Sequence, residues 1–246
     1  MTPYTVITFS TGNKPDKIRT PLVRDTNATY LCVTDNPFLS ANGWKTIYDK
    51  NLLQLSNGRD RTAAVKFNPF AYTDDEIIIT MDASFQINKS LNSTISHMQG
   101  HDIGLRTHPV RTNVYDEIPL WVATRGMSEE SANRIQALIA SSKLPKGNTG
   151  LYEGSLIIWK NNSLCKTIAN CTLTAIKICG NDYEWCKSNQ IPFSIMMNTK
   201  FNWVSALAFS NFKNVTRYIH HSDTINREIP RTNSFVFGKP IYSAAI

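Results

Sequence analysis

The stretch DEIIITMDASFQI, residues 75–87, predicts the centre of the fold. Three consecutive isoleucines at 77–79, without polar alternation, are typical of a strand covered on both faces. Asp82 directly follows the apolar run, so we expect it at the C-terminal end of that strand, where open α/β sheets bind ligands. Two interpretations stay open. Asp82, with Ala83 and Ser84, could hold a divalent cation or a ribose, or Asp82 could cap a turn.

Shorter apolar runs precede this stretch and predict further strands at residues 5–9, 30–33 and 44–48. Ser10 and Thr11 follow the first run, and Asp35 follows the second. Strands that each leave a polar loop at one edge describe the first half of a nucleotide-binding α/β sheet. Ser10 and Thr11 could therefore meet a nucleotide, although this loop has no Walker or G-x-G-x-x-G pattern and a plain surface loop is the alternative.

The remaining pattern alternates between helical and strand-like segments. We expect helical structure within residues 51–72, at 90–98 with Ser90 or Asn88 as the cap, at 128–143 with Ser128 as the cap, and at 165–187. Further strands are expected at residues 102–106 and 151–160. No internal repeat or linker is visible, so one domain over 1–246 is the expectation.

Composition places the chain among ordinary globular proteins, with 41% hydrophobic and 18% charged residues over 246 positions. The formal net charge of +7 favours a polyanionic partner. No apolar run approaches the ~20 residues that cross a bilayer, and no signal peptide is visible. We therefore expect a cytoplasmic protein with no membrane partner, and the sequence leaves its oligomeric state open.

Five cysteines occur, at positions 32, 165, 171, 179 and 186. Their spacings match none of the usual zinc patterns, so buried free thiols are favoured over a zinc site. A basic segment with Arg59, Arg61 and Lys66 precedes the central strand. It could be a diphosphate clamp or a solvated helix face.

Several short motifs occur in a characteristic order. They are Thr34-Asp35-Asn36 after the second strand, Lys66 to Pro69, the aspartate motif Asp82-Ala83-Ser84, a His-Pro-x-Arg…Tyr-Asp-Glu stretch from His108 to Glu117, and Leu-x-Glu-Gly before the apolar run at 151–158. Together they resemble glycosyltransferases of the GT-A type, in particular a family with a degenerate aspartate motif. The resemblance covers roughly the first two-thirds of the chain.

The resemblance implies an α/β fold, a single GT-A-like (Rossmann-like) domain with a mixed central sheet flanked by helices. Residues 1–120 would form the donor-nucleotide half and residues 121–246 the acceptor half. It also implies a nucleotide-sugar donor, from which a hexosyl or pentosyl group is moved. The donor-binding residues expected on this basis are Ser10, Thr11, Asp35, Lys66, Asp82, Ala83, Ser84 and Arg111.

A cofactor is implied as well, Mn²⁺ or Mg²⁺, which neutralises the departing diphosphate. Asp82 matches the first acid of the motif, and Ser84 stands where a second acid is usual. His220 or His221 could complete the metal shell as a late histidine does in relatives, or could lie in a surface turn.

The catalytic base is not fixed by the motifs. Relatives often carry an Arg-Asp-Gln triplet, and the nearest match is the triplet at 188–190, whose central residue is Asn189. Since an amide does not accept a proton as a carboxylate does, the base would be Asp182, Glu184 or Glu153, or the reaction retains configuration.

The acceptor is open among a carbohydrate, a small molecule and a hydroxymethylated base in DNA. DNA is considered because Arg217, Arg227, Arg231 and Lys239 could track phosphates, although an ordinary basic surface is the alternative. A different class of protein, a non-catalytic nucleotide- or nucleic-acid-binding module, would use the charge but leave Asp82 unexplained.

Overall fold

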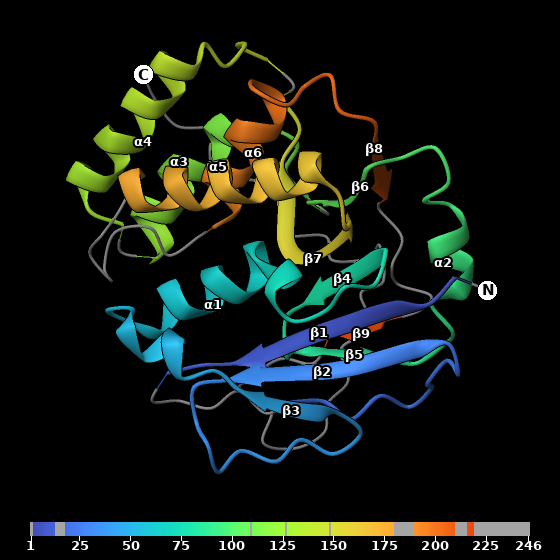
Figure 1. The fold of residues 1–246 in the computed structure, drawn as a ribbon. Helices are drawn as coiled ribbons and strands as arrows, with labels where there is room; N and C mark the ends of the chain where they lie inside the picture. Colours follow the sequence, from blue (N-terminus) through green and yellow to red (C-terminus); the bar gives the residue numbers. More distant parts are fainter. Residues whose placement is uncertain are drawn as a thin grey trace.

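A computed structural model of the chain describes residues 2–12, 18–108, 110–125, 127–147, 149–179, 189–209 and 216–218. Within them, seven strands form one sheet in the order β3-β2-β1-β4-β7-β6-β8, and two more form a small ribbon, β5-β9 (Figure 1). The strands are β1 Tyr4–Ser10, β2 Ala28–Thr34, β3 Lys45–Tyr48, β4 Ile77–Met81, β5 Phe85–Ile87, β6 Ile103–Thr107, β7 Tyr152–Lys160, β8 Ala206–Phe209 and β9 Thr216–Tyr218.

Strand direction places the functional edge of the sheet. Strands β3, β2, β1 and β4 run parallel, β7 runs antiparallel to both β4 and β6, and β8 is parallel to β6. The C-terminal ends of all strands except β7 therefore meet at one edge of the large sheet. The first residues of β7 arrive at the same edge, since Met81 at the end of β4 pairs with Leu156.

The helices divide unequally over the sheet. They are α1 Gly58–Phe67, α2 Asn92–Ser96, α3 Val114–Arg125, α4 Glu129–Ser142, α5 Ser163–Cys179 and α6 Gln190–Asn198, with short 3₁₀ turns η1 Lys50–Gln54 and η2 Pro69–Ala71. Helices α1 and α3–α6 share one hydrophobic core with one face of the sheet. The opposite face packs against the β5 segment and the α2 region (Figure 1).

Strand β4 is buried on both faces, as its unbroken apolar run predicts. Ile78 faces the helical core, whereas Ile77 and Ile79 face the smaller core on the other side. The neighbouring Trp159 of β7 is fully buried, and its indole N–H donates to Thr80 Oγ1 at 3.1 Å. Both faces of β4 are thus covered by the two hydrophobic cores. The first side chain that can be exposed therefore comes after Met81, at the end of the strand.

The expected α/β class, with a mixed central sheet flanked by helices, is confirmed. The first four strands of the sheet lie within two residues of the predicted runs, and Ser128 caps α4 by accepting a hydrogen bond from the Ser131 N–H. The helix expected at 90–98 is shorter than predicted. It begins at Asn92, no side chain caps it, and Ser90 Oγ instead accepts from the Asn92 N–H.

Four of the described elements were not predicted. Helix α3 contains Pro119, which argues against a helix interior, and β5, β8 and β9 are too short to show a period. Helix α6 was recognised only as an apolar stretch, because seven of its nine residues are buried and no polar face marks a helical period.

A half-buried carboxylate joins the start of β1 to the loop before α2. Asp25 Oδ2 accepts hydrogen bonds from the Tyr4 hydroxyl and from the Leu91 N–H, the latter at 2.8 Å. Burial alone would raise the pKa of the Asp25 carboxyl, but hydrogen bonds from Tyr4 and from residues 90–92 outweigh it and hold that pKa below its usual value. The ionised form of Asp25 is therefore the one that the fold uses.

We expect Asp25→Asn to lower the free energy of unfolding by about 1–3 kcal/mol near pH 7, because the acceptor loses its charge. A group whose folded pKa is depressed stabilises the protein above its unfolded pKa of about 4 and loses that contribution as pH falls through the folded value. Urea unfolding of both proteins between pH 7 and pH 3 should show the difference shrinking with acid. The exposed Asp116→Asn is the control, and a difference that stays constant to pH 3 would contradict this account.

Candidate functional site

The ends of β1 and β2 are tied together by Asp35. Its side chain is 5% exposed and accepts from the Gly12 N–H at 2.9 Å and from Arg61 Nη1 at 2.7 Å. Arg61 belongs to α1, so this one carboxylate joins two strand ends and the helix that follows. Asp35 was predicted to bind the donor, and in the structure its carboxylate is engaged by these two protein groups.

The loop after β1 packs directly on the first turn of α1. Thr11 Oγ1 donates to the Gly58 carbonyl at 3.0 Å and lies 2.8 Å from the Thr62 hydroxyl. A Cβ built on Gly58 would lie 3.2 Å from the Cα of Gly12, which itself has a φ of +87°. Ser10 is 2% exposed. The two glycines therefore let backbone meet backbone where the loop crosses the helix.

Asp82 lies one residue beyond β4, as predicted. Its N–H donates to the Ser155 carbonyl at 2.9 Å, and its own carbonyl accepts from the Phe85 N–H at 3.0 Å, which fixes a turn over residues 82–85. Ala83 and Ser84 within that turn are each 3% exposed. The Asp82 side chain is 35% exposed, so it is the most accessible carboxylate at this edge among the ion-paired ones.

Lys66 is the partner of Asp82. Its Nζ lies 2.9 Å from Asp82 Oδ1, and its side chain is 8% exposed. The same ammonium lies 5.5 Å from the centre of the Phe9 ring at the end of β1. Lys66 comes from the last turn of α1, so the helix carries the cation across the ends of β1 and β4.

A second buried ion pair lies on the neighbouring strands. Arg106 of β6 and Glu153 of β7 are cross-strand partners, and Arg106 Nη1 lies 2.6 Å from Glu153 Oε2. Ser155 Oγ contacts both, donating to Glu153 at 3.2 Å and accepting from Arg106 at 3.3 Å. The guanidinium also lies 5.1 Å from the ring centre of Phe85. Glu153, a predicted base candidate, is thus held by an arginine.

These contacts give the edge a simple charge pattern. Three acids each have a basic partner, in the pairs Asp35–Arg61, Asp82–Lys66 and Glu153–Arg106. The pairs come from strands β2, β4, β6 and β7 and from helix α1. Because the two charges of each ion pair cancel, the three pairs add no net charge to this edge. An anionic ligand that binds here would contact basic side chains that already have an acidic partner.

A polar cluster beyond β6 engages Arg111, another predicted donor ligand. Its guanidinium forms an ion pair with Glu117, which is 1% exposed, and one of its nitrogens lies 2.9 Å from His108 Nε2. Glu117 also accepts from Trp121 Nε1 at 2.8 Å and from Gln190 Nε2 at 2.9 Å. The sequence showed the motif from His108 to Glu117 but not that Gln190, 73 positions after Glu117, completes it.

Four predicted site residues lie outside the part of the chain that the structure describes: the base candidates Asp182 and Glu184, and the proposed metal ligands His220 and His221. The basic residues at 227, 231 and 239 lie outside it as well, and of Arg217 only the backbone in β9 is described.

The surroundings of Asp82 can be compared with the ligands that a divalent cation needs. The described residues contain no group of three His, Cys, Asp or Glu side chains placed to hold a metal. Asp82 Oδ1 is nevertheless a buried acceptor that receives no hydrogen bond from them. A carboxylate oxygen without a hydrogen bond suits an ion such as Mg²⁺, which takes one or two protein oxygens and completes its shell with substrate phosphates and water. On that basis Asp82 fits such an ion, and Ser84 lies in the same turn.

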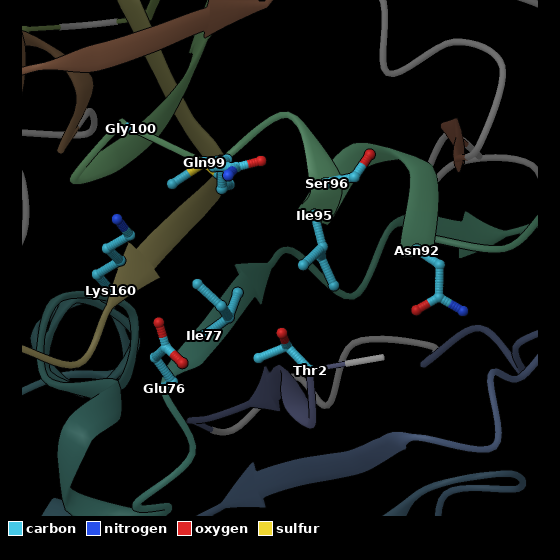
Figure 2. A pocket seen from close by; sticks show the side chains of 10 residues that line it. Thr2, Glu76, Ile77, Asn92, Ile95, Ser96, Gln99, Gly100 and Lys160 are labelled. Atoms are coloured by element: carbon cyan, nitrogen blue, oxygen red, sulfur yellow. The ribbon is translucent and has the colours of Figure 1, made fainter.

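A separate pocket of about 420 Å³ opens at the opposite edge of the sheet, beside the first residue of β4 (Figure 2). Ile77, Ile95 and Met98 form its apolar part, and Glu76 and Lys160 lie on its wall. It is separated from Asp82 by the length of β4. A groove of about 650 Å³ also runs between α3 and α4.

The cysteines behave as buried thiols. Cys32, Cys165 and Cys179 are buried, and Cys171 is half-buried. Burial raises the pKa of both Cys32 and Cys165 to about 12, which keeps them protonated and unreactive near neutral pH. Buried free thiols were therefore predicted correctly for Cys32 and Cys165, while Cys186 lies outside the described residues.

Comparisons with known proteins give a distant likeness. No model of a known protein family and no curated protein matches the sequence. Among solved structures, the apo form of mouse xyloside xylosyltransferase 1 aligns with 9% identity over 79% of this chain and 81% of that chain, at a TM-score of 0.44. A likeness at this level carries no argument about activity. None of the described helices is long and apolar enough to cross a membrane.

The Arg106–Glu153 pair generates a stability prediction. We expect Arg106→Met to destabilise the protein by about 3–5 kcal/mol, because it leaves the Glu153 carboxylate buried without its cation. The double variant Arg106→Met with Glu153→Leu should recover much of that loss, since no buried charge remains unpaired. Denaturant unfolding of the two single variants and the double variant measures the coupling. Additive losses would show that the two side chains act independently.

Proposed function

We propose that this protein is a glycosyltransferase that moves a hexosyl or pentosyl group from a nucleotide-sugar donor to a hydroxyl acceptor. The observation that carries the proposal is the accessible carboxylate of Asp82 at the C-terminal end of β4, ion-paired with Lys66, with the Asp35–Arg61 and Glu153–Arg106 pairs at the same edge of the sheet. Open α/β sheets bind nucleotides at this edge. The type of reaction, sugar transfer, is inferred from the resemblance carried by the ordered sequence motifs.

The donor would lie across the ends of β1 and β4. Its diphosphate gathers negative charge as the sugar departs, and preplaced cations stabilise that charge without reorganising. Lys66 is the nearest such cation to Asp82. The loop at Ser10 and Thr11, held against α1, would form the wall on the nucleotide side, with Asp35 and Arg61 supporting it from below.

We propose Mn²⁺ or Mg²⁺ as the cofactor, held by Asp82 and Ser84 among the described residues and by His220 or His221 outside them. When bound, such an ion supplies Lewis-acid stabilisation to the leaving diphosphate. Arg111, fixed by the buried Glu117, would add a positively charged group at the end of β6. For the acceptor hydroxyl, Asp182, Glu184 and Glu153 stay the candidate bases.

The acceptor is proposed to be a carbohydrate or a hydroxymethylated base in DNA, with the cytoplasm as the site of action. Net charge is the support for DNA, since a +7 protein attracts a soluble polyanion. A transfer assay on duplexes with and without hydroxymethylcytosine, beside oligosaccharide acceptors, separates the two. Mass added only to oligosaccharides would assign the acceptor as carbohydrate.

The first test of the proposed donor measures whether a nucleotide sugar stabilises the folded protein. Screening nucleotide sugars with and without Mn²⁺, we expect one donor to raise the melting temperature, because a ligand at 100 times its Kd adds about 2.7 kcal/mol to the native state. The same donor should be hydrolysed slowly without acceptor. Stabilisation by nucleotides without any hydrolysis would favour the non-catalytic binding module.

We expect Asp82→Asn to lower turnover by about 100-fold or more while the protein still folds, since the amide keeps the shape of the side chain and loses its charge. Asp74→Ala is the matched control, because Asp74 is an exposed acid before the other end of β4. Steady-state donor hydrolysis and transfer measure both. Unchanged turnover in Asp82→Asn would remove Asp82 from the donor site.

A further inference from the structure

The environment of Asp82 Oδ1 is unusual for a carboxylate oxygen. It is buried, it accepts no hydrogen bond from any residue that the structure describes, and a lysine ammonium lies 2.9 Å away. The contact with Lys66 is thus an ion pair without an aligned hydrogen bond. Buried acceptors normally have a hydrogen-bonding partner, so this oxygen is only partly satisfied.

Lys66 is held at this position by its surroundings rather than by Asp82 alone. It is in the last turn of α1, where the helix dipole favours a cation. Its stem passes over Gly154, where a Cβ would lie 3.7 Å from the lysine Cδ, and its ammonium faces the Phe9 ring. The nearby carboxylate of Glu153 already has Arg106 as its partner.

We propose that Lys66 is a built-in counter-cation for Asp82, which neutralises the carboxylate in the empty site and yields its place to a divalent cation. The proposal rests on the function proposed above and adds a regulatory role for a residue of the same site. Because like charges repel strongly at this separation in a partly buried place, the ammonium and a metal ion cannot both lie against Oδ1.

The exchange has two consequences for the chain's own residues. Lys66 sets the affinity of Asp82 for metal, since the ammonium and the metal ion compete for the same carboxylate. The four-carbon stem of lysine lets the ammonium swing away while α1 stays in place. The displaced charge is then available to a phosphate oxygen of the donor, so that metal and donor bind more tightly together than apart.

The test measures metal affinity directly. Mn²⁺ is titrated into the protein without donor, and free Mn²⁺ is followed by electron paramagnetic resonance. We expect Lys66→Met to bind Mn²⁺ about tenfold or more tightly than the wild type, because the competing cation is gone. Lys66→Arg keeps the charge and should bind no more tightly than the wild type. Asp82→Asn should abolish binding in either background.

Matched controls separate this effect from general electrostatics. Arg134→Met removes a cation from an exposed ion pair with Glu130 on α4 and should leave Mn²⁺ affinity unchanged. Circular dichroism and melting curves check the fold of each variant, and Lys66→Gln replaces Lys66→Met if the latter unfolds.

The proposal is overturned if Lys66→Met leaves the Mn²⁺ affinity unchanged or weaker, or if neither protein binds Mn²⁺. Failure of the proposed sugar transfer would look different. In that case Mn²⁺ would still bind more tightly to Lys66→Met, and no nucleotide sugar would be hydrolysed by the wild type.

Discussion

Burial of β4 on both faces is the constraint from which the rest of the structure follows. A strand covered by helices on one side and by the β5 segment on the other cannot carry a charge along its length without a large desolvation penalty. The first charged side chain after the start of β4 is therefore that of Asp82, directly past the end of the strand. Lys66 of α1 reaches that position and pairs with it.

The site is assembled from charges that are paired before any ligand arrives. Buried ion pairs contribute little net stability, because desolvation of both partners offsets their attraction. In this site the ion pairs hold loops and side chains in fixed positions. Asp35 fixes the loop after β1 against α1, and Glu153 fixes Arg106 across two strands, so the edge is shaped by groups that a ligand need not touch.

The sequence located every described strand of the large sheet except β8, including β6 and β7 of the antiparallel half. Apolar runs ending in polar residues locate β1, β2 and β4, because each strand is continuous and buried. The same reasoning placed Asp82 at its strand end. It did not show that Lys66 reaches Asp82 or that Gln190 reaches Glu117, since these contacts depend on how α1 and α6 cross the sheet. Nor did it show that Gly12 and Arg61 engage the carboxylate of Asp35.

The backbone contact between Gly12 and Gly58 bears on how this chain can change over evolution. A side chain at position 58 would press on the loop after β1, and one at position 12 would be strained by its positive φ. The two positions are 46 residues apart and are constrained by each other more than by their neighbours. In divergent relatives, whose overall identity has decayed, paired small residues at these two positions would survive as a recognisable signature of the same loop-on-helix crossing.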